Sequence, residues 1–437
     1  MKNNLLFKTA LIIVIALLLL IPTAMINDLI YERENTQQLA VEEVSSKWGA
    51  EQTLTGPILS IPYYKYIKQY SKKDSAEKII QIKEYIHFLP DVLDVNSSLK
   101  PEKRYRGIYE IVVYNSNIQF SGKFNSIELS NIDIPIKDIL FDKAFVTIGI
   151  NDLRGIEKQI DLNWNKENVS FNPGTVTNDI VNSGINADVK IGINDKTSYE
   201  FSFNLDLKGS QLLHFIPVGK TSDFKMESVW NNPSFNGAFL PDSRNVSESG
   251  FNAHWNIIHL NRNYPQVWVG SNHSVKDAAF GVDLLLPIDN YQKSTRTIKY
   301  AILFIALTFM VFFFVEILNK KFIHPIQYIL VGFALIIFFS LLLALSEHIK
   351  FNYAFILSAI LTLILITGYV KAILKSNNLT FLISGVLAIL YTFIFVIIQL
   401  QDYALLIGSI GLFIILGIVM YFSRKIDWYN INLDKNN

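Results

Sequence analysis

Five ionisable side chains stand at or beside the apolar stretches of this chain: Glu316, His324, Glu347, His348 and Asp402. Glu316 is the principal candidate, because it lies inside an apolar run of membrane-spanning length, where an ionisable residue marks a functional site by default. The alternative is a surface role. Lys320 follows four residues later, in the order that favours an ion pair on a helix, and both side chains would then extend to the membrane interface. The other four residues lie in loops that flank the apolar runs.

The remaining residues form no recognisable catalytic or metal-binding pattern. His254 and His259 are five residues apart, so on a strand they would face opposite sides of the sheet. The sequence contains no HExxH motif, no GxSxG motif and no glycine-rich phosphate-binding loop. It also has no cysteine, which excludes disulfides, thiolate metal ligands and cysteine nucleophiles. We therefore predict no metal, no cofactor and no catalytic residue, and expect a protein that is not an enzyme.

The apolar residues are concentrated in long blocks. Of the 437 residues, 50% are hydrophobic and 18% are charged. The blocks, each close to the roughly 20 residues that a helix needs to cross the hydrocarbon of a bilayer, are Thr9–Ile26, Thr297–Leu318, Pro325–Leu345, Phe351–Val370, Leu379–Leu400 and Tyr403–Phe422. The first block is long for the core of a secretory signal and offers a poor cleavage site. We predict six transmembrane helices, the first one retained as an anchor in the lipid bilayer.

Lysine and arginine are distributed unequally between the two sides of these helices. The short segments on one side contain Lys2, Lys8, Lys320, Lys321, Lys371, Lys375, Arg424 and Lys425, whereas those on the other side contain only Lys350. Because positively charged loops remain in the cytoplasm, both termini are predicted to be cytoplasmic. The predicted parts are an anchor at 1–26, a periplasmic domain at 27–296, a five-helix bundle at 297–422 and a cytoplasmic tail at 423–437.

The long segment after the anchor has the pattern of antiparallel sheets. Apolar and polar residues alternate over Ile185–Ile193 and over Tyr199–Leu207, which predicts strands with one buried face. The polar residues 194–198 between them predict a hairpin loop. Further strands are predicted at Ile108–Tyr114, Ile118–Phe120 and Phe145–Ile150. The expected fold is a six-helix membrane protein with a large β-rich extracytoplasmic domain, built of stacked sheets, between its first and second helices.

The residues that join the anchor to this domain have a different pattern. Leu29–Trp48 is rich in Glu and Gln, places Val41, Val44 and Trp48 on one helical face, and is followed by Gly49. These features predict a helix that ends at the glycine.

The charge balance limits the possible partners. Lys and Arg number 39 and Asp and Glu number 38, for a formal net charge of +1, whereas a nucleic-acid binder carries a basic excess. No nucleic-acid partner is therefore expected; the predicted partners are the lipid bilayer and a periplasmic or envelope component, in an oligomeric state that the sequence does not specify. No acidic residue or histidine occupies the middle of a predicted span, although ion-coupled transporters usually place one there.

Short motifs along essentially the whole chain resemble those of a known family. In the first part they are Glu32–Arg33, Trp48–Gly49, Gly56–Pro57, Ile61–Tyr63, Leu89–Pro90, Arg104–Tyr109 and Leu260–Arg262. In the membrane part they are Lys299–Tyr300, Glu316, Ile323–Tyr328, Leu345–His348, Asp402–Leu406 and Asp427–Tyr429. With the order of anchor, large domain and five helices, these motifs resemble the CreD family of bacterial inner membrane proteins, described as cell envelope integrity proteins.

The resemblance implies a role in envelope maintenance, linked to a two-component regulatory system, colicin tolerance and the β-lactam response. It implies no reaction, ligand or catalytic residue, but its motifs add Arg106 and Gln327 to the positions of possible functional importance. The leading hypothesis is a non-catalytic envelope protein that acts through its periplasmic domain. The alternatives are a transporter or channel formed by the last five helices, and a membrane-bound enzyme acting on lipid or glycan. His324 and Glu347 flank one span, about 30 Å apart at 1.5 Å per residue, so one active site would not contain both.

Overall fold

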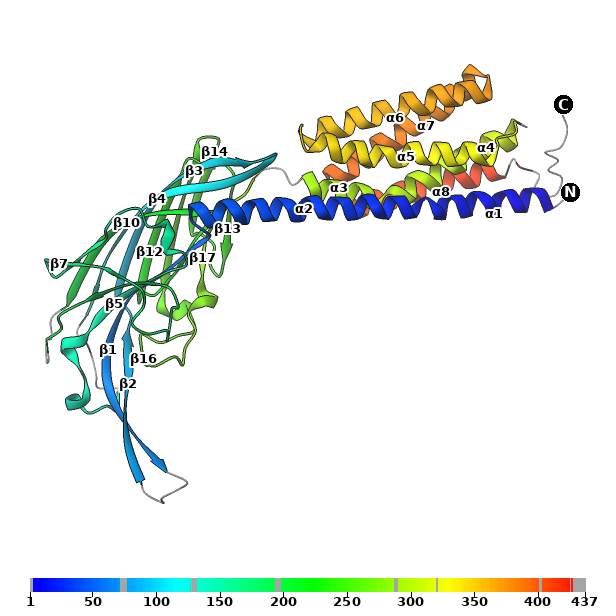
Figure 1. Cartoon of the computed structure of the whole chain (residues 1–437). Coiled ribbons are helices and arrows are strands. Elements are labelled where there is room, and N and C mark those ends of the chain that lie inside the picture. The colour runs from blue at the N-terminus through cyan, green and yellow to red at the C-terminus, as the bar shows by residue number, and fades with distance from the viewer. Residues whose placement is uncertain are drawn as a thin grey trace. The chain divides into compact units, whose positions relative to one another are not determined.

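The computed structural model describes residues 3–70, 77–125, 127, 132–192, 198–286, 290–319, 321–400, 403–424 and 426. The chain forms two compact units (Figure 1). The first combines Met1–Gln38 with Ile288–Asn437, and the second is Leu39–Pro287. We call them the helical unit and the β domain.

The anchor and the helix predicted after it form one nearly continuous helical segment. Helix α1 (Asn3–Leu18) is separated from helix α2 (Leu20–Trp48) only by a turn at Leu19. Pro22 explains the interruption, because proline has no N–H to donate to the carbonyl of Leu18. The same helix α2 therefore begins in the helical unit and ends in the β domain.

The helical unit contains the membrane-spanning helices. A short helix α3 (Asn290–Lys299) precedes the five long ones, which are α4 (Ala301–Leu318), α5 (Pro325–Ser346), α6 (Phe351–Leu374), α7 (Asn377–Gln399) and α8 (Ala404–Ser423). With Phe7–Trp48, these make six helices in the described chain that are long and apolar enough to cross a membrane. The six predicted spans are thus confirmed. The second one differs at its start, because helical structure begins at Asn290 and is interrupted at Tyr300.

The space between α1, α4, α5, α6 and α7 is filled by apolar side chains, among them Ile12, Phe309, Leu335, Ile366 and Leu387. Aromatic rings pack beside them: the ring of Tyr391 lies 4.8 Å from those of both Phe304 and Phe338, measured between centroids. Helix α8 buries none of its described residues completely, and it packs against α7, where Gly411 lies close to the ring of Phe393.

The β domain consists of two sheets (Figure 1). The nine-stranded sheet follows the order β13-β17-β11-β1-β5-β9-β8, with β2 paired to β1 and β16 paired to β2. Its strands are β1 (Gln52–Tyr70), β2 (Glu77–Phe88), β5 (Phe145–Ile150), β8 (Asn172–Pro173), β9 (Gly184–Asp188), β11 (Leu212–Ile216), β13 (Pro233–Gly237), β16 (Val267–Val269) and β17 (Phe280–Leu284).

The eight-stranded sheet follows the order β14-β15-β12-β3-β4-β10-β6-β7. Its strands are β3 (Val92–Arg106), β4 (Tyr109–Phe124), β6 (Asp161–Trp164), β7 (Glu167–Ser170), β10 (Tyr199–Ser210), β12 (Thr221–Ser228), β14 (Ser243–Ser247) and β15 (Gly250–Ile258). The two sheets pack face to face over one apolar core. For example, Phe224 of β12 lies 5.3 Å from Phe215 of β11 and 5.0 Å from Phe280 of β17, between ring centroids.

Several sequence-based strand predictions are confirmed, one predicted strand is too long and one pairing is wrong. Of the strand predicted at Ile185–Ile193, only the first part is a strand, β9. Phe145–Ile150 is strand β5, and Tyr199–Leu207 lies in β10. The two strands predicted within 108–120 are one long strand, β4. The predicted hairpin is wrong because β9 pairs with β5 and β8 in one sheet, whereas β10 pairs with β4 and β6 in the other. Its loop, at 194–198, lies almost entirely outside the described residues.

Candidate functional site

The segment between α4 and α5 builds the principal candidate site. Glu316 stands in the last turn of α4, and Pro325 opens α5, where its missing N–H costs no hydrogen bond. His324 caps α5. Its side-chain Nδ1 accepts a hydrogen bond from the backbone N–H of Ile326 at 3.3 Å, and its backbone N–H donates to Oε1 of Gln327 at 3.0 Å. This reciprocal arrangement is a capping box. His324 and Gln327 therefore start the helix, and His324 itself is exposed.

The carboxylate of Glu316 is buried, with 1% of the residue exposed. It accepts hydrogen bonds from the ammonium of Lys8 in α1, from the hydroxyl of Tyr328 in α5 at 3.1 Å and from the N–H of Ile323 at 3.4 Å. The Lys8 ammonium also donates to the carbonyl of Ile323 at 2.7 Å and lies 4.2 Å from the centre of the Phe322 ring. Lys8, Glu316 and Tyr328 thus form a buried cluster that ties α1 to α4 and α5.

Glu316 has a different partner from the one predicted from the sequence. The predicted partner, Lys320, lies outside the described residues, and the structure pairs Glu316 with Lys8. Glu316 is buried and does not extend to the interface. The useful signal was the predicted topology, since it places Lys8 at the same membrane face as the end of α4. A charge buried without its partner is very costly, which explains why both members of the pair are buried together.

A second polar cluster lies at the opposite end of α5. Oε1 of Glu347 is 3.8 Å from Nε of Arg33 in α2 and accepts a hydrogen bond from the hydroxyl of Tyr291 in α3 at 3.3 Å. In the same region, Nδ2 of Asn290 donates to the carbonyl of Ser346 at 2.6 Å. The helical segment α1–α2 is therefore bound to the helical unit at two levels, by Lys8 and by Arg33.

The described positions His324, Gln327 and His348 take no part in these two clusters. His348 is exposed, and its backbone N–H closes the end of α5 on the carbonyl of Leu345 at 3.0 Å. Asp402 lies outside the described residues. His324 and Glu347 are separated by the 22 residues of α5, or about 33 Å at 1.5 Å per residue, so the structure does not bring the predicted residues into one site.

Helix α2 ends against the β domain through a dense set of polar contacts. Nε of Arg106 donates to Oε2 of Glu43 at 3.0 Å, and the indole N–H of Trp48 donates to the carbonyl of Tyr114 at 3.3 Å. Hydrogen bonds from Lys47 and Arg106 lower the pKa of Glu43. The helix is followed by Gly49. A larger residue does not fit at this position, because its Cβ would lie 2.8 Å from the carbonyl oxygen of Lys208. Arg106 thus contacts the last turns of the helix through an exposed ion pair.

The β domain also contains a hydrogen-bonded serine, histidine and aspartate that the sequence analysis missed. His87 Nδ1 lies 2.9 Å from Oγ of Ser60, and its Nε2 lies 3.0 Å from Oδ2 of Asp179. Burial lowers the pKa of His87, while Asp179 opposes this shift. The neutral ring then donates from Nε2 to Asp179 and accepts the hydroxyl proton of Ser60 at Nδ1.

The same three residue types form a serine hydrolase triad, but there the serine contacts Nε2 and the aspartate contacts Nδ1, whereas here the two nitrogens are exchanged. The surroundings differ as well. Ser60 is 2% exposed and His87 is 1% exposed, so in this conformation a substrate carbonyl has no access to the hydroxyl. These hydrogen bonds connect β1 and β2 with the segment that carries Asp179. Among the described residues, no group of three or more His, Asp or Glu side chains is arranged to hold a metal ion.

The comparisons with known proteins agree with this architecture. Residues 4–429 match the family described as inner membrane protein CreD. The chain belongs to the CreD family. The inner membrane protein CreD of Escherichia coli (strain K12) is 34% identical over 438 residues, which cover 100% of this chain and 96% of that protein. The protein is accordingly a multi-pass protein of the inner membrane.

Among solved structures, an M1 zinc metallopeptidase from Deinococcus radiodurans shows a limited likeness, with a TM-score of 0.19 and 6% sequence identity. It covers 39% of this chain and 38% of the peptidase chain. A likeness at this level carries no argument about fold or function.

The motifs that resemble the CreD family coincide with the contacts described above. Glu316 and Ile323–Tyr328 build the buried cluster and the cap of α5. Leu345–His348 and Arg33 build the cluster at the other end of α5. Trp48–Gly49 and Arg106 build the end of α2. All three sets of contacts hold the same helical segment.

Proposed function

We propose that this protein supports the integrity of the cell envelope without catalysing a reaction, and that its β domain acts in the periplasm while both termini remain in the cytoplasm. The orientation is supported by the lysines and arginines that lie on one side of the spans. The envelope role is supported by membership of the CreD family. The partner is an envelope component that contacts the β domain.

One observation carries this proposal: the helical segment α1–α2 is held by the helical unit through Lys8 and Arg33 and by the β domain through Glu43 and Trp48. Such a segment can pass a change in the β domain to the membrane helices, because it is bound at both of its ends. This connection requires neither a reaction nor a transported solute.

Two further observations favour this function over its alternatives. A transport pathway needs a continuous line of polar groups and water between the helices, whereas the described helices are packed through a cluster of apolar side chains, and the buried ion pair of Lys8 with Glu316 stands at one end of α4. Covalent catalysis by a serine needs an accessible hydroxyl, whereas Ser60 is buried.

The test is a deletion strain challenged with detergent and with a β-lactam. We expect greater sensitivity than in the parent, restored by the wild-type gene. Complementation by a gene carrying Ser60→Ala would support the non-catalytic role, because a triad nucleophile would be essential. A deletion strain that survives both challenges like its parent would refute the envelope role. Failure of the Ser60→Ala protein, when it accumulates to the wild-type level, would refute the non-catalytic part.

A further inference from the structure

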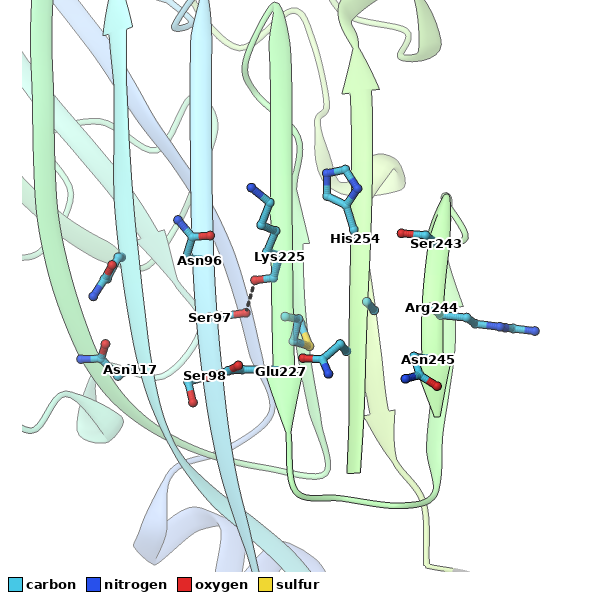
Figure 2. A pocket seen from close by; sticks show the side chains of 14 residues that line it. Asn96, Ser97, Ser98, Asn117, Lys225, Glu227, Ser243, Arg244, Asn245 and His254 are labelled. Atoms are coloured by element: carbon cyan, nitrogen blue, oxygen red, sulfur yellow. Dashed lines mark hydrogen bonds between the residues drawn. The ribbon is translucent and has the colours of Figure 1, made fainter. Parts of the chain in front are cut away.

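Hollows of the β domain differ in construction. One of about 660 Å³ is lined by residues such as Asn96, Lys225 and His254 (Figure 2). All of its described lining residues lie in strands of the eight-stranded sheet, so it has a floor without walls. Another, of about 390 Å³, lies on the nine-stranded sheet and also has two walls. We call it the walled cavity; its volume lies within the range of about 300–1,000 Å³ found for small-molecule sites.

The floor of the walled cavity is formed by three neighbouring strands. Thr53 and Thr55 of β1 alternate with Leu54, which belongs to the apolar core, so the two threonine side chains lie on the opposite face of the sheet. Thr55 pairs with Gly149 of β5 on one side and with Ile216 of β11 on the other. The floor therefore presents hydroxyl groups from the middle strand of the three.

One wall is the segment 180–183, which is held at both of its ends. Before it, Asp179 contacts His87 at 3.0 Å between Oδ2 and Nε2. At its end, the carbonyl of Ser183 accepts a hydrogen bond from the N–H of Ile150 at 3.1 Å. The buried contacts of His87 therefore position a wall of the cavity.

Both walls add aliphatic side chains to the lining. Val181 of the first wall packs directly on the floor, because Gly149 has no side chain; a Cβ there would lie 2.6 Å from Cγ1 of Val181. The second wall is the single 3₁₀ turn Lys276–Ala278 together with the buried Val275 before it. An apolar group thus finds contacts on either side of the cavity.

Two polar features of the lining have no partner within the described chain. Thr55 is 4% exposed, and its hydroxyl hydrogen-bonds to no described residue. A buried hydroxyl in this state is unfavourable, so a ligand group that pairs with it gains free energy. Lys276 is exposed, forms no ion pair with a described residue, and is the one charged side chain among the described lining residues. The cavity therefore suits a ligand with a hydrogen-bonding group, an aliphatic part and an anionic group.

These requirements separate classes of ligand. The alkyl chain of a fatty acid would leave the hydroxyls of the floor unpaired, and an uncharged sugar offers no anion to Lys276 and little aliphatic surface to the walls. A short peptide has all three parts, because each of its backbone amides donates and accepts hydrogen bonds, its side chains can be aliphatic, and its C-terminus is a carboxylate.

We propose that the walled cavity binds a short aliphatic peptide with a free C-terminal carboxylate. Thr55 hydrogen-bonds to a peptide amide, Lys276 pairs with the carboxylate, and Val181 and Val275 contact the aliphatic side chains. This inference goes beyond the proposed function, which names no ligand, and it does not depend on the orientation of the protein in the membrane.

The experiment is equilibrium dialysis of the full-length protein, purified in detergent, against two pools of N-acetylated tripeptides of alanine, valine and leucine. One pool has free C-terminal carboxylates and the other is amidated, so the pools differ in one charge. Thr55→Val removes the hydroxyl but keeps a β-branched side chain that suits a strand, and Lys276→Gln removes the cation. The control variant combines Lys220→Gln with Thr221→Val, at exposed positions at the start of β12 in the other sheet.

Wild type and control are expected to bind the free acids about threefold more tightly than the amides, because an exposed ion pair contributes little. Lys276→Gln should bind both pools equally. Thr55→Val should bind both about fivefold more weakly, which corresponds to one lost hydrogen bond. A wild-type protein that binds neither pool would overturn the site, and a variant that binds both pools like the control would overturn the contact assigned to its residue. The deletion strain tests the proposed function independently of these outcomes.

Discussion

The ammonium of Lys8, at the start of the first membrane helix, donates a hydrogen bond to the carboxylate of Glu316 at the end of α4, and both side chains are buried. The two residues are 308 positions apart in the chain. Their contact holds the anchor helix α1 against α4, so it connects the two sequence segments that make up the helical unit. Tyr328 and the backbone of Ile323 donate two further hydrogen bonds to the carboxylate.

Replacing one member of this pair should destabilise the helical unit. Lys8→Met leaves the carboxylate of Glu316 buried without its counter-ion, and we expect a loss of about 3 kcal/mol in the free energy of unfolding. The double variant Lys8→Met with Glu316→Gln should recover part of this loss, because no buried charge remains. Thermal unfolding of the detergent-solubilised protein measures both effects. Lys371→Gln, at an exposed position, is the control, and strictly additive losses in the double variant would argue against the pairing.

His324 should act only through the cap of α5. His324→Ala removes the acceptor for the N–H of Ile326 and should lower stability by about 1 kcal/mol. His324→Asn supplies a capping oxygen, so it should restore stability and complement a deletion strain. If both variants accumulate normally and both fail to complement, the imidazole has a role beyond the cap.

The burial of His87 and its hydrogen bonds to Ser60 and Asp179 predict a pH dependence of stability. Since burial lowers the pKa of His87 in the folded protein below its ordinary value of 6.5, the unfolded chain binds the proton more readily. The contribution of the neutral, buried His87 to the free energy of unfolding is therefore present in full above about pH 6.5. It decreases as the pH falls from there towards the lower pKa of the folded protein.

The matched variant is His87→Gln, whose amide can still bond to Ser60 and Asp179 but does not titrate. The free energy of unfolding, measured between pH 7.5 and pH 5 for both proteins, should fall more steeply for the wild type. Parallel curves would show that His87 does not contribute. His87→Leu should be less stable than either protein at every pH, because it leaves Ser60 and Asp179 without their partner.

The proposed orientation can be tested with single cysteines, because the natural chain has none. Ser249→Cys, exposed beyond strand β14, should react with a membrane-impermeant maleimide in spheroplasts. Asn378→Cys, exposed near the start of α7, should react only after the membrane is permeabilised. The reverse labelling pattern would place the β domain in the cytoplasm and overturn both the orientation and the proposed function.

The sequence by itself determined the membrane helices and many of the strands. A span depends on the length and hydropathy of one continuous segment, such as Pro325–Leu345, and these are visible without a structure. The strand at Tyr199–Leu207 was predictable for a similar reason, because alternation with a period of two reflects one buried face.

Only the tertiary structure decided which of these elements meet. Alternation shows that β9 and β10 each bury a face, but it does not show that the two belong to different sheets. The pairing of Lys8 with Glu316 and the contacts of His87 with Ser60 and Asp179 join distant segments. Such pairings depend on how whole elements pack to bury their apolar surface, and no local pattern of residues contains that information.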